Sequence, residues 1–342
     1  MQQKPLIALL AVTAFALVLA AFAVLGNGGP FADPLVGTPV LPEVAPNLAA
    51  ITRVSLVRGD VATTLIRDGE AWAVAERGNY PADAQKLRAL LLGLAELTYV
   101  EPKTKQPQSY PRLQIEDAGD KDAKSTLITI TDAKSSLLGE VIAGKRRVDQ
   151  LGGGDDGVYL RKPGNAQSWL ARGTLDVSGD TASWLDQKLF DLPAAGVKEV
   201  VLAAPDGSRL TITRDKPEDK FRLVELAKDK KLKSDDALAA PAAALAGFTL
   251  SDVKLAAGAN FPSDGVSHAR FAMFNGLTVT IDLTDQDKVS WARIVASGSG
   301  DAAATAQGLN SRLAPWVFAL PQYEADLLKT RLATLLAPPK AS

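Results

Sequence analysis

The sequence contains no cysteine among its 342 residues. Disulfide bonds, thiolate zinc sites and a cysteine nucleophile are therefore excluded, and so is a lipid anchor on an acylated N-terminal cysteine. Histidine occurs once, at His268, which leaves little material for a transition-metal site or for a general base near neutral pH. We expect no cofactor and no metal, and the sequence indicates no catalytic residue.

An excess of charge of either sign is also missing. The chain has 38 basic and 39 acidic residues, and its net charge is −1. Proteins that bind nucleic acid usually carry a basic surplus or a basic stripe, so we expect no nucleic-acid partner. With 46% hydrophobic residues the composition is that of a globular protein, and the length favours two domains.

Long apolar runs are rare, and the one that is present lies near the N-terminus. Leu6 to Leu25 has no charged residue over twenty positions, enough for a helix of about 30 Å, which matches the hydrocarbon core of a bilayer. We predict that residues 1–26 form a single-pass anchor in a bacterial inner membrane. Lys4 favours a cytoplasmic N-terminus, which places the bulk of the chain in the periplasm. Ala21-Phe22-Ala23 leaves a cleaved signal peptide open as an alternative.

Residues 27–50 are rich in glycine and proline. Proline removes a backbone donor and glycine is costly to order, so such a segment favours an extended chain. We predict a tether that separates the anchor from the first domain.

The remaining residues read as an internal repeat, with the first copy at 51–190 and the second at 191–342. The copies begin at Ile51 and Val197, so the offset is 197 − 51 = 146 residues. Alternating apolar and polar residues predict three strands at the start of each copy, followed by a helix. These elements are expected at 51–56, 64–67, 71–74 and 82–97 in the first copy, and at 197–202, 210–214, 221–223 and 234–250 in the second.

The later part of each copy is also rich in predicted strands. They are expected at 125–130, 138–143 and 157–161 in the first copy, and at 277–283 and 289–294 in the second. A connecting helix at 182–190, a mobile loop at 297–308 and a final helix at 322–336 complete the prediction. The fold class is thus α+β, with two tandem repeated domains, each an antiparallel sheet with a helix packed on one face.

Several motifs resemble a known family in their order along the chain. They are Gly157-Val158-Tyr159-Leu160-Arg161, the run from Trp184 to Pro193, Val197-Lys198-Glu199-Val200, and the run from Trp316 to Tyr323. Together they resemble the bacterial "domain of unknown function 4340" family over about residues 51–336. The resemblance implies an exported or membrane-anchored protein, and some members are associated with auxiliary components of gliding-motility-type ABC transporters. It implies no catalytic residues.

Three motifs could indicate chemistry, but a structural interpretation is favoured for each. The run from Gly139 to Arg146 resembles a phosphate-binding P-loop, yet it ends in arginine where serine or threonine is needed and reads as a strand. The run from Gly152 to Gly157 resembles one turn of a calcium-binding β-roll, which needs stacked copies. Ser267-His268 could belong to a hydrolase, but no nucleophile-elbow motif accompanies it.

The function that these observations favour is non-enzymatic. We expect a membrane-tethered periplasmic accessory or scaffold protein of an envelope or transport complex, bound to the inner membrane through Leu6 to Leu25 and to protein partners in the envelope. The alternative is a periplasmic binding module that holds a small molecule, lipid or glycan in the cleft between the two repeats.

Overall fold

The computed structural model describes residues 33–148, 156–224, 226–227, 230–234, 236–262 and 264–337. The predicted anchor at Leu6 to Leu25 and the first part of the predicted tether lie outside these residues. Within the described ranges, no helix combines the length and the apolar character needed to cross a membrane.

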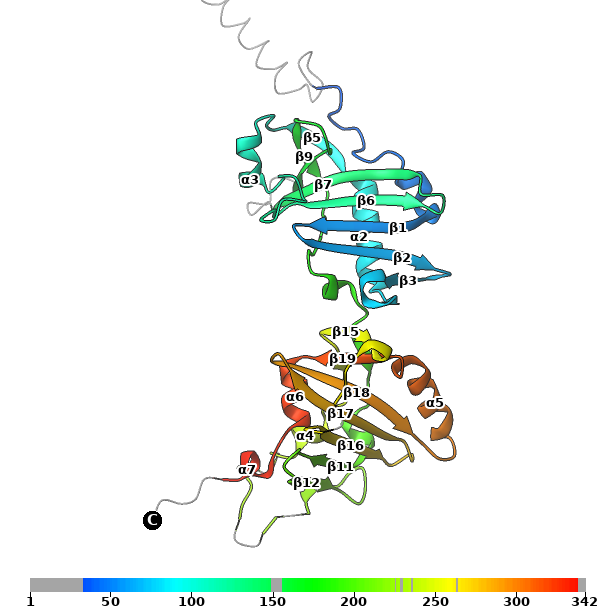
Figure 1. Cartoon of the computed structure of the whole chain (residues 1–342), viewed down its shortest axis with the longest axis vertical. Coiled ribbons are helices and arrows are strands. Elements are labelled where there is room, and N and C mark those ends of the chain that lie inside the picture. Colours follow the sequence, from blue (N-terminus) through cyan, green and yellow to red (C-terminus); the bar gives the residue numbers. More distant parts are fainter. Residues whose placement is uncertain are drawn as a thin grey trace, which may run out of the picture. The chain divides into compact units, whose positions relative to one another are not determined.

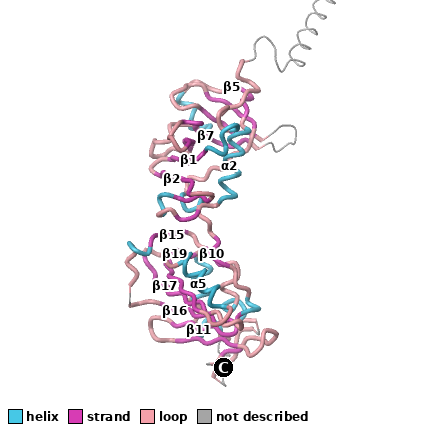
Figure 2. The backbone as a smooth tube through the Cα atoms, turned by 90° about the vertical axis from the view of Figure 1, so that its right-hand side faces the viewer, coloured by secondary structure: helices cyan, strands magenta, loops and turns pink. Residues whose placement is uncertain are grey.

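Antiparallel sheets dominate the described part of the chain (Figures 1 and 2). The first sheet has the strand order β4-β3-β2-β1-β6-β7-β8-β9-β5. Its strands are β1 (Ile51–Arg58), β2 (Val61–Asp68), β3 (Ala71–Val74), β4 (Tyr80–Pro81), β5 (Thr98–Pro102), β6 (Thr126–Asp132), β7 (Leu137–Arg147), β8 (Gly157–Arg161) and β9 (Ser168–Arg172).

The second sheet has the strand order β13-β12-β11-β16-β17-β18-β19-β15. Its strands are β11 (Val197–Ala203), β12 (Arg209–Thr213), β13 (Arg222–Leu223), β15 (Asp252–Leu255), β16 (Ser267–Met273), β17 (Thr278–Gln286), β18 (Val289–Ser297) and β19 (Trp316–Leu320). A further pair consists of β10 (Lys188–Phe190) and β14 (Phe248–Thr249).

Helices are shorter and accompany the sheets. The α-helices are α2 (Ala84–Glu96), α3 (Tyr110–Leu113), α4 (Ala239–Ala242), α5 (Ala302–Leu313), α6 (Gln322–Leu328) and α7 (Leu332–Leu335). The 3-10 turns are η1 (Ala45–Ala50), η2 (Ala75–Arg77), η3 (Pro107–Ser109), η4 (Thr181–Trp184), η5 (Ala194–Gly196) and η6 (Ala256–Gly258). Two large antiparallel sheets with some helices confirm the α+β class.

The chain divides into two compact units. One consists of residues 1–60 and 89–177, and the other of residues 61–88 and 178–342. The boundary that the sequence predicts between residues 190 and 191 stays a prediction.

The two sheets have the same strand order. Adding ten to each strand number of β3-β2-β1-β6-β7-β8-β9-β5 gives the order of the second sheet, and β4 is the one additional strand of the first. A register irregularity also recurs. It lies between Ile51 and Arg53 where β1 pairs with β6, and between Val197 and Glu199 where β11 pairs with β16. The two positions are 146 residues apart, and a bulge at the same place fixes the same register beyond it.

Residues 33–50 correct the tether prediction, because they are folded against the first sheet's edge strand β5. The Gly37 amide donates to the Tyr99 carbonyl at 2.7 Å, and the Val40 amide to the Leu97 carbonyl at 2.8 Å. Val40, Leu41 and Val44 are buried. These three apolar side chains gain more by burial than the glycines and prolines around them cost to order.

Four predicted elements differ from the structure. The alanine-rich segment 234–250 forms only one short helix, the four-residue α4, and then turns through Gly247, with a φ of 61°, into β14. The predicted loop 297–308 is largely helical, because α5 covers Ala302–Leu313 and buries Ala302 and Ala306. The segment 182–190 forms the end of η4 and then β10, and the predicted final helix 322–336 is broken into α6 and α7.

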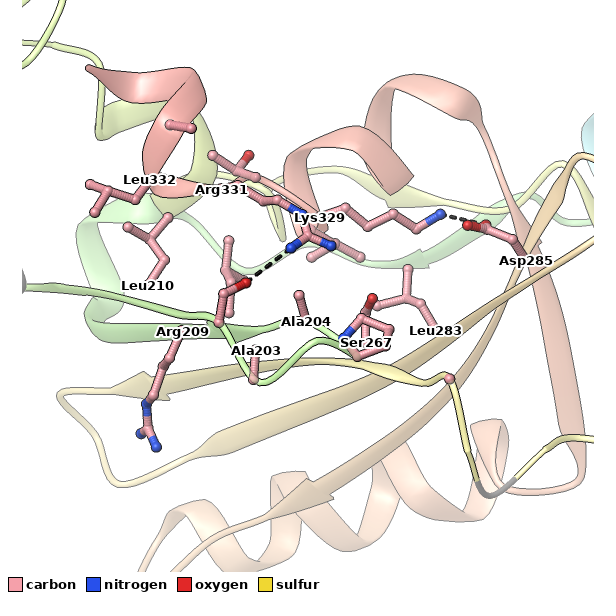
Figure 3. Close-up of a pocket in the computed structure, with 17 residues that line it drawn as sticks. Ala203, Ala204, Arg209, Leu210, Ser267, Leu283, Asp285, Lys329, Arg331 and Leu332 are labelled. Atoms are coloured by element: carbon pink, nitrogen blue, oxygen red, sulfur yellow. Dashed lines mark hydrogen bonds and ion pairs between the residues drawn. The ribbon is translucent and has the colours of Figure 1, made fainter.

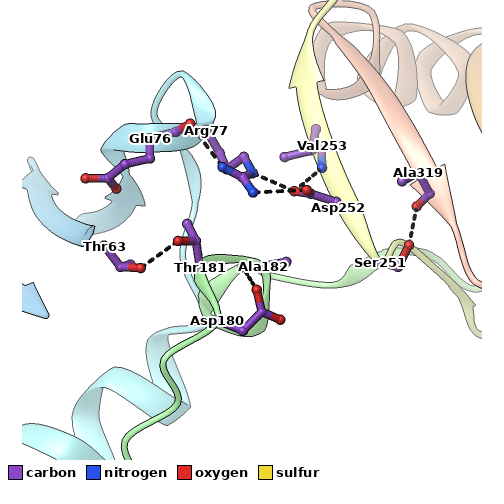
Figure 4. A network of polar contacts seen from close by, with 10 residues as sticks. All are labelled: Thr63, Glu76, Arg77, Asp180, Thr181, Ala182, Ser251, Asp252, Val253 and Ala319. Atoms are coloured by element: carbon purple, nitrogen blue, oxygen red, sulfur yellow. Dashed lines mark hydrogen bonds and ion pairs between the residues drawn. The ribbon is translucent and has the colours of Figure 1, made fainter. Parts of the chain in front are cut away.

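Two polar contacts order the second unit (Figure 4). The hydroxyls of Thr63 and Thr181 lie 2.7 Å apart and both side chains are buried. Arg77 binds Asp252 through two nitrogens, at 2.6 and 3.0 Å. The hydrogen bond to Asp252 raises the pKa of Arg77, because the carboxylate stabilises the charged guanidinium. This paired geometry holds η2 against β15.

Candidate functional site

A pocket of about 420 Å³ lies within the second unit (Figure 3). Three sheet segments and one helical connection surround it. The sheet contributes the turn between β11 and β12, the start of β16 and the end of β17. The helical connection contributes residues 328–333, which run from the last residue of α6 into the first residues of α7. The volume is within the range of sites that bind small molecules.

The sheet side of the pocket is apolar, and the strand register explains why. Leu202 pairs with Leu210, and Ser267 pairs with Leu283. Directly paired residues of antiparallel strands point to the same face, so these side chains share the face that bears the pocket. The three leucines of the sheet and Leu328 of α6 are buried.

One ionic contact joins the helical connection to the sheet. Lys329 donates to Asp285 at the end of β17, and to the Ser290 hydroxyl at 2.8 Å. Ser290 in turn donates to Asp285 at 2.7 Å. Burial tends to raise the pKa of Asp285, but the hydrogen bonds from Lys329 and Ser290 outweigh it, and the pKa lies below its ordinary value. Asp285 is therefore held as a carboxylate, and Lys329 is held over the pocket.

A second ionic contact lies at the other side of the same connection. Arg331 donates to Asp206 at 2.7 Å and to the Ser208 hydroxyl at 2.9 Å. The Ser208 hydroxyl and amide also donate to Asp206. These hydrogen bonds, with that from Arg331, lower the pKa of Asp206 to about 2. The two contacts hold the connection at both sides of the pocket. Figure 3 shows Lys329 pointing toward Asp285, and Arg331 with its own dashed contact on the other side.

The break between α6 and α7 brings the cations into place. α6 ends at Leu328, and the Thr330 hydroxyl donates to the Leu327 carbonyl at 2.8 Å, which competes with continued helix. After α7, the Lys233 amide donates to the Leu335 carbonyl and the Ala337 amide to the Lys231 carbonyl. With both ends fixed, residues 329–331 cross the pocket in a non-helical conformation.

The motifs weighed in the sequence do not form a common site. Ser267 and His268 are neighbours on β16, so their side chains point to opposite faces of the sheet. Ser267 lines the pocket, whereas His268 is exposed and lies 2.7 Å from Asp282 on the other face. The P-loop-like run from Gly139 to Arg146 lies in strand β7, as predicted. Gly152 to Asp155 lie outside the described residues.

Sequence reasoning missed every ionic residue of this pocket. Lys329 and Asp285 are 44 positions apart, and Arg331 and Asp206 are 125 apart. Because the sequence predicts one continuous helix over 322–336, it does not predict the break between α6 and α7 that places Lys329 and Arg331 at the pocket. The signal that could have indicated it is Lys329-Thr330-Arg331, a run of three consecutive polar residues between Leu327-Leu328 and Leu332.

The described residues include no group of three or more histidine, aspartate or glutamate side chains placed to hold a metal ion. The pocket itself has an apolar floor and an ionic rim.

Comparison with known proteins places the chain in a family. No curated protein matches the chain. One family model, described as "Domain of unknown function (DUF4340)", matches residues 72–266, which is more than half of the sequence. The match covers three of the four motifs on which the resemblance was based, and the fourth, from Trp316 to Tyr323, lies beyond it. The resemblance is thereby confirmed, and the chain belongs to the DUF4340 family.

Proposed function

We propose that this chain is a non-enzymatic, membrane-tethered accessory protein of the bacterial envelope, and that its second unit is a binding module. The observation that carries the binding role is the pocket of about 420 Å³, with its leucine floor and the cations of residues 329–331 above it. The tether rests on the uncharged run from Leu6 to Leu25, and the periplasmic location on Lys4 ahead of it.

The repeat belongs to this proposal. The equal strand order and the bulge that recurs after 146 residues support an origin of the two sheets by duplication. A duplicated frame with different side chains at equivalent positions suits a protein that holds partners or ligands, since each copy can change its surface while keeping its core.

The pocket's chemistry favours an amphipathic ligand. Leu202, Leu210, Leu283 and Leu328 offer apolar surface, and Lys329 and Arg331 offer donors at the rim. A ligand with a hydrocarbon part and a carboxylate or phosphate head satisfies both. The anionic head of the ligand would bind Lys329 and Arg331, either in place of the aspartates that these side chains already contact or in addition to them.

The proposal includes no hydrolase activity, because of where Ser267 and His268 lie. Ser267 and His268 lie on opposite faces of the sheet, so His268 is not placed to activate Ser267. Asp285, the carboxylate nearest the pocket floor, is held charged by Lys329 and Ser290. A carboxylate held in this way serves to position Lys329.

Co-purification tests the binding role. The full chain is extracted from membranes, and the small molecules that remain bound are identified by mass spectrometry after organic extraction. We expect an amphipathic molecule that is enriched with the wild-type chain and lost in Ala204→Phe, which fills the pocket. Ala304→Phe, on the exposed side of α5, is the matched control and should keep it. Equal recovery from all three proteins would contradict the proposed site.

A separate measurement tests the tether and the accessory role. The intact mass of the mature chain distinguishes an uncleaved anchor from cleavage after Ala23. A photoreactive residue at Tyr323, which is 70% exposed on α6, can then cross-link neighbours in intact cells. Recovery of envelope proteins supports the accessory role, and recovery of cytoplasmic proteins alone would refute it.

A further inference from the structure

A second cavity, of about 230 Å³, lies within the first unit. Its lining includes Arg58 at the end of β1, and Lys145 and Arg146 near the end of β7. Among the described residues, Asp176 is the one carboxylate that lines it. With three cationic side chains and one carboxylate, the lining of this cavity has a net positive charge. The proposed function assigns no role to that charge.

The cavity occupies the same place in the first sheet as the pocket does in the second. The recurring bulge aligns Arg58 with Ala204, since both follow it at an offset of 146. Thr126 pairs with Ala143 on β7, as Ser267 pairs with Leu283 on β17. Beyond Ala143 the strand β7 shifts register against β8, so that Arg146 pairs with Val158 two positions along β8 from Leu160, the partner of Ala143. In the second sheet Asp285 pairs with Ser290, two positions along β18 from Ala292, the partner of Leu283, so Arg146 stands where the second sheet has Asp285. The two sites are thus equivalent in position and opposite in charge on the sheet.

Arg58 is half-buried and has no carboxylate partner within the described residues. Its Nε donates to the Thr126 hydroxyl at 2.9 Å, and its Nη2 to the Val177 carbonyl at 3.1 Å. Both acceptors are neutral. Burial lowers the pKa of Arg58, because no nearby anion compensates the loss of water around the guanidinium. A half-buried guanidinium that contacts only neutral acceptors can accept an anion as a further partner.

Lys145 and Arg146 extend the positive surface. The register of β7 against β8 shifts between Ala143 and Arg146, so a bulge changes the direction of the side chains there. Arg146 makes only a loose ion pair with Asp156, at 4.0 Å. Lys145 is exposed and makes no ion pair within the described residues. Two cations are therefore available beside the half-buried guanidinium.

We propose that this cavity is an anion-binding site that takes a phosphate group. Arg58 would supply the planar donors that match two phosphate oxygens, and Lys145 and Arg146 would supply further charge at the opening. A volume of about 230 Å³ holds a phosphate group with its first bridging atoms, but is smaller than the pocket of the second unit. The phosphate could belong to a lipid head or to a free ion, and the experiment separates these sources.

The test uses the full chain in non-ionic detergent, at constant ionic strength maintained with sodium chloride. Inorganic phosphate is titrated while the thermal unfolding midpoint is recorded, since a ligand that binds the folded state raises it. A second arm replaces phosphate by phosphatidylglycerol doped into the micelles, with phosphatidylcholine as the neutral reference. Stabilisation by phosphate itself identifies a free ion, and stabilisation by phosphatidylglycerol alone identifies a lipid head.

Three variants decide where the anion binds. We expect Lys145→Ala and Arg58→Lys each to raise the dissociation constant by about tenfold, as the loss of one charge-assisted contact predicts. Arg147→Ala removes the same charge from an exposed position of the same strand outside the cavity, and should leave binding unchanged. Circular dichroism confirms that each variant is folded. The proposal is overturned if neither phosphate source stabilises the chain, or if Arg147→Ala weakens binding as much as Lys145→Ala.

Discussion

The first and second sheets differ in the side chains of one row that crosses equivalent strands. In the first sheet this row consists of Arg58, Thr126, Ala143 and Arg146, and in the second of Ala204, Ser267, Leu283 and Asp285. The first sheet carries the cations itself. The second carries an anion, and its cations come from the connection between α6 and α7.

This difference explains why the second pocket is larger. Arg58 extends across the row to reach Thr126 and Val177, and so occupies space that Ala204 leaves open. The second sheet recovers the lost polar contacts by pairing Asp285 and Asp206 with residues of the helical connection. The sheet supplies the cations in the first case, and a later segment supplies them in the second.

The largest expected effect comes from Gly144→Thr on β7, compared with Thr284→Gly on β17, since Gly144 directly follows Ala143 and Thr284 directly follows its counterpart Leu283. A Cβ at Gly144 would lie 2.5 Å from the carbonyl oxygens of Leu113 and Gln114, so Gly144→Thr forces the backbone apart. We expect a loss of about 3 kcal/mol in the free energy of unfolding, measured with urea. Thr284→Gly should cost only about 1 kcal/mol, from backbone entropy and lost packing. Equal costs would show that the two positions are not differently constrained.

Removing Arg58 is expected to have the next largest effect. Arg58→Met leaves the Thr126 hydroxyl, which is fully buried, and the Val177 carbonyl without their donor. The expected loss is about 1–2 kcal/mol in urea unfolding, because unsatisfied buried acceptors are costly. Ala204→Arg places an arginine at the equivalent position of the second sheet. It should lower the free energy of unfolding by less than Arg58→Met does, and should close the second pocket to its ligand. A stability gain in Arg58→Met would indicate that the uncompensated charge outweighs both hydrogen bonds.

A smaller effect is expected from Lys329→Met, which removes the cation over Asp285. We expect a loss of about 1 kcal/mol at pH 7, since the contact is partly exposed. Asp285 has a lowered pKa, so its stabilisation is present above the unfolded value near 3.8 and is lost as the pH falls through the folded value. Urea midpoints from pH 6 to pH 2 should therefore fall less steeply in the variant. An unchanged slope would contradict the assignment to Lys329. Lys145→Met, which removes a lysine from the first sheet, should leave this slope unaltered.

The smallest effect is expected from Glu324→Gln on α6. Glu324 accepts hydrogen bonds from the Thr249 amide and hydroxyl, which the amide oxygen of glutamine can retain. Burial raises the pKa of Glu324 despite these bonds. A raised pKa means that the wild type gains stability as the pH falls through it. We expect a change within about 0.5 kcal/mol at pH 7 and the absence of that gain in the variant. A loss well above this value would show that Thr249 requires the charged carboxylate.

The strands of both sheets could be predicted because their alternation is strong. Ile51 to Leu56 and Val197 to Leu202 show it clearly, and the offset of 146 residues between them recurs in the bulges. The helix α5 could not be predicted from the same kind of pattern. Its buried residues are mostly alanines, and Asn310 fixes it by pairing its side-chain amide with the backbone of Ala296. A single tertiary contact of that kind leaves no periodic signal.

The candidate site was less predictable than the fold, for a physical reason. Its floor consists of leucines that any core strand contains, and its ionic residues meet only after the chain has folded. The break at Lys329 depends on hydrogen bonds from Thr330 and on the pairing of Leu335 with Lys233. Neither is visible as a local propensity. The resemblance to a family helped to place the chain but supplied no site, because the family's function is unknown.

The pairing of residues 37–40 with β5 affects how the protein stays soluble. A free edge strand offers unpaired amides and carbonyls to any other strand, which promotes aggregation. Here Gly37 and Val40 occupy that edge, and Pro39, which has no amide hydrogen, faces Thr98. A soluble fragment that begins after Val44 would lose this cover and leave its apolar contacts open. A fragment that begins at Asp33 keeps the edge closed, so the boundary for expression lies upstream of the first strand of the sheet.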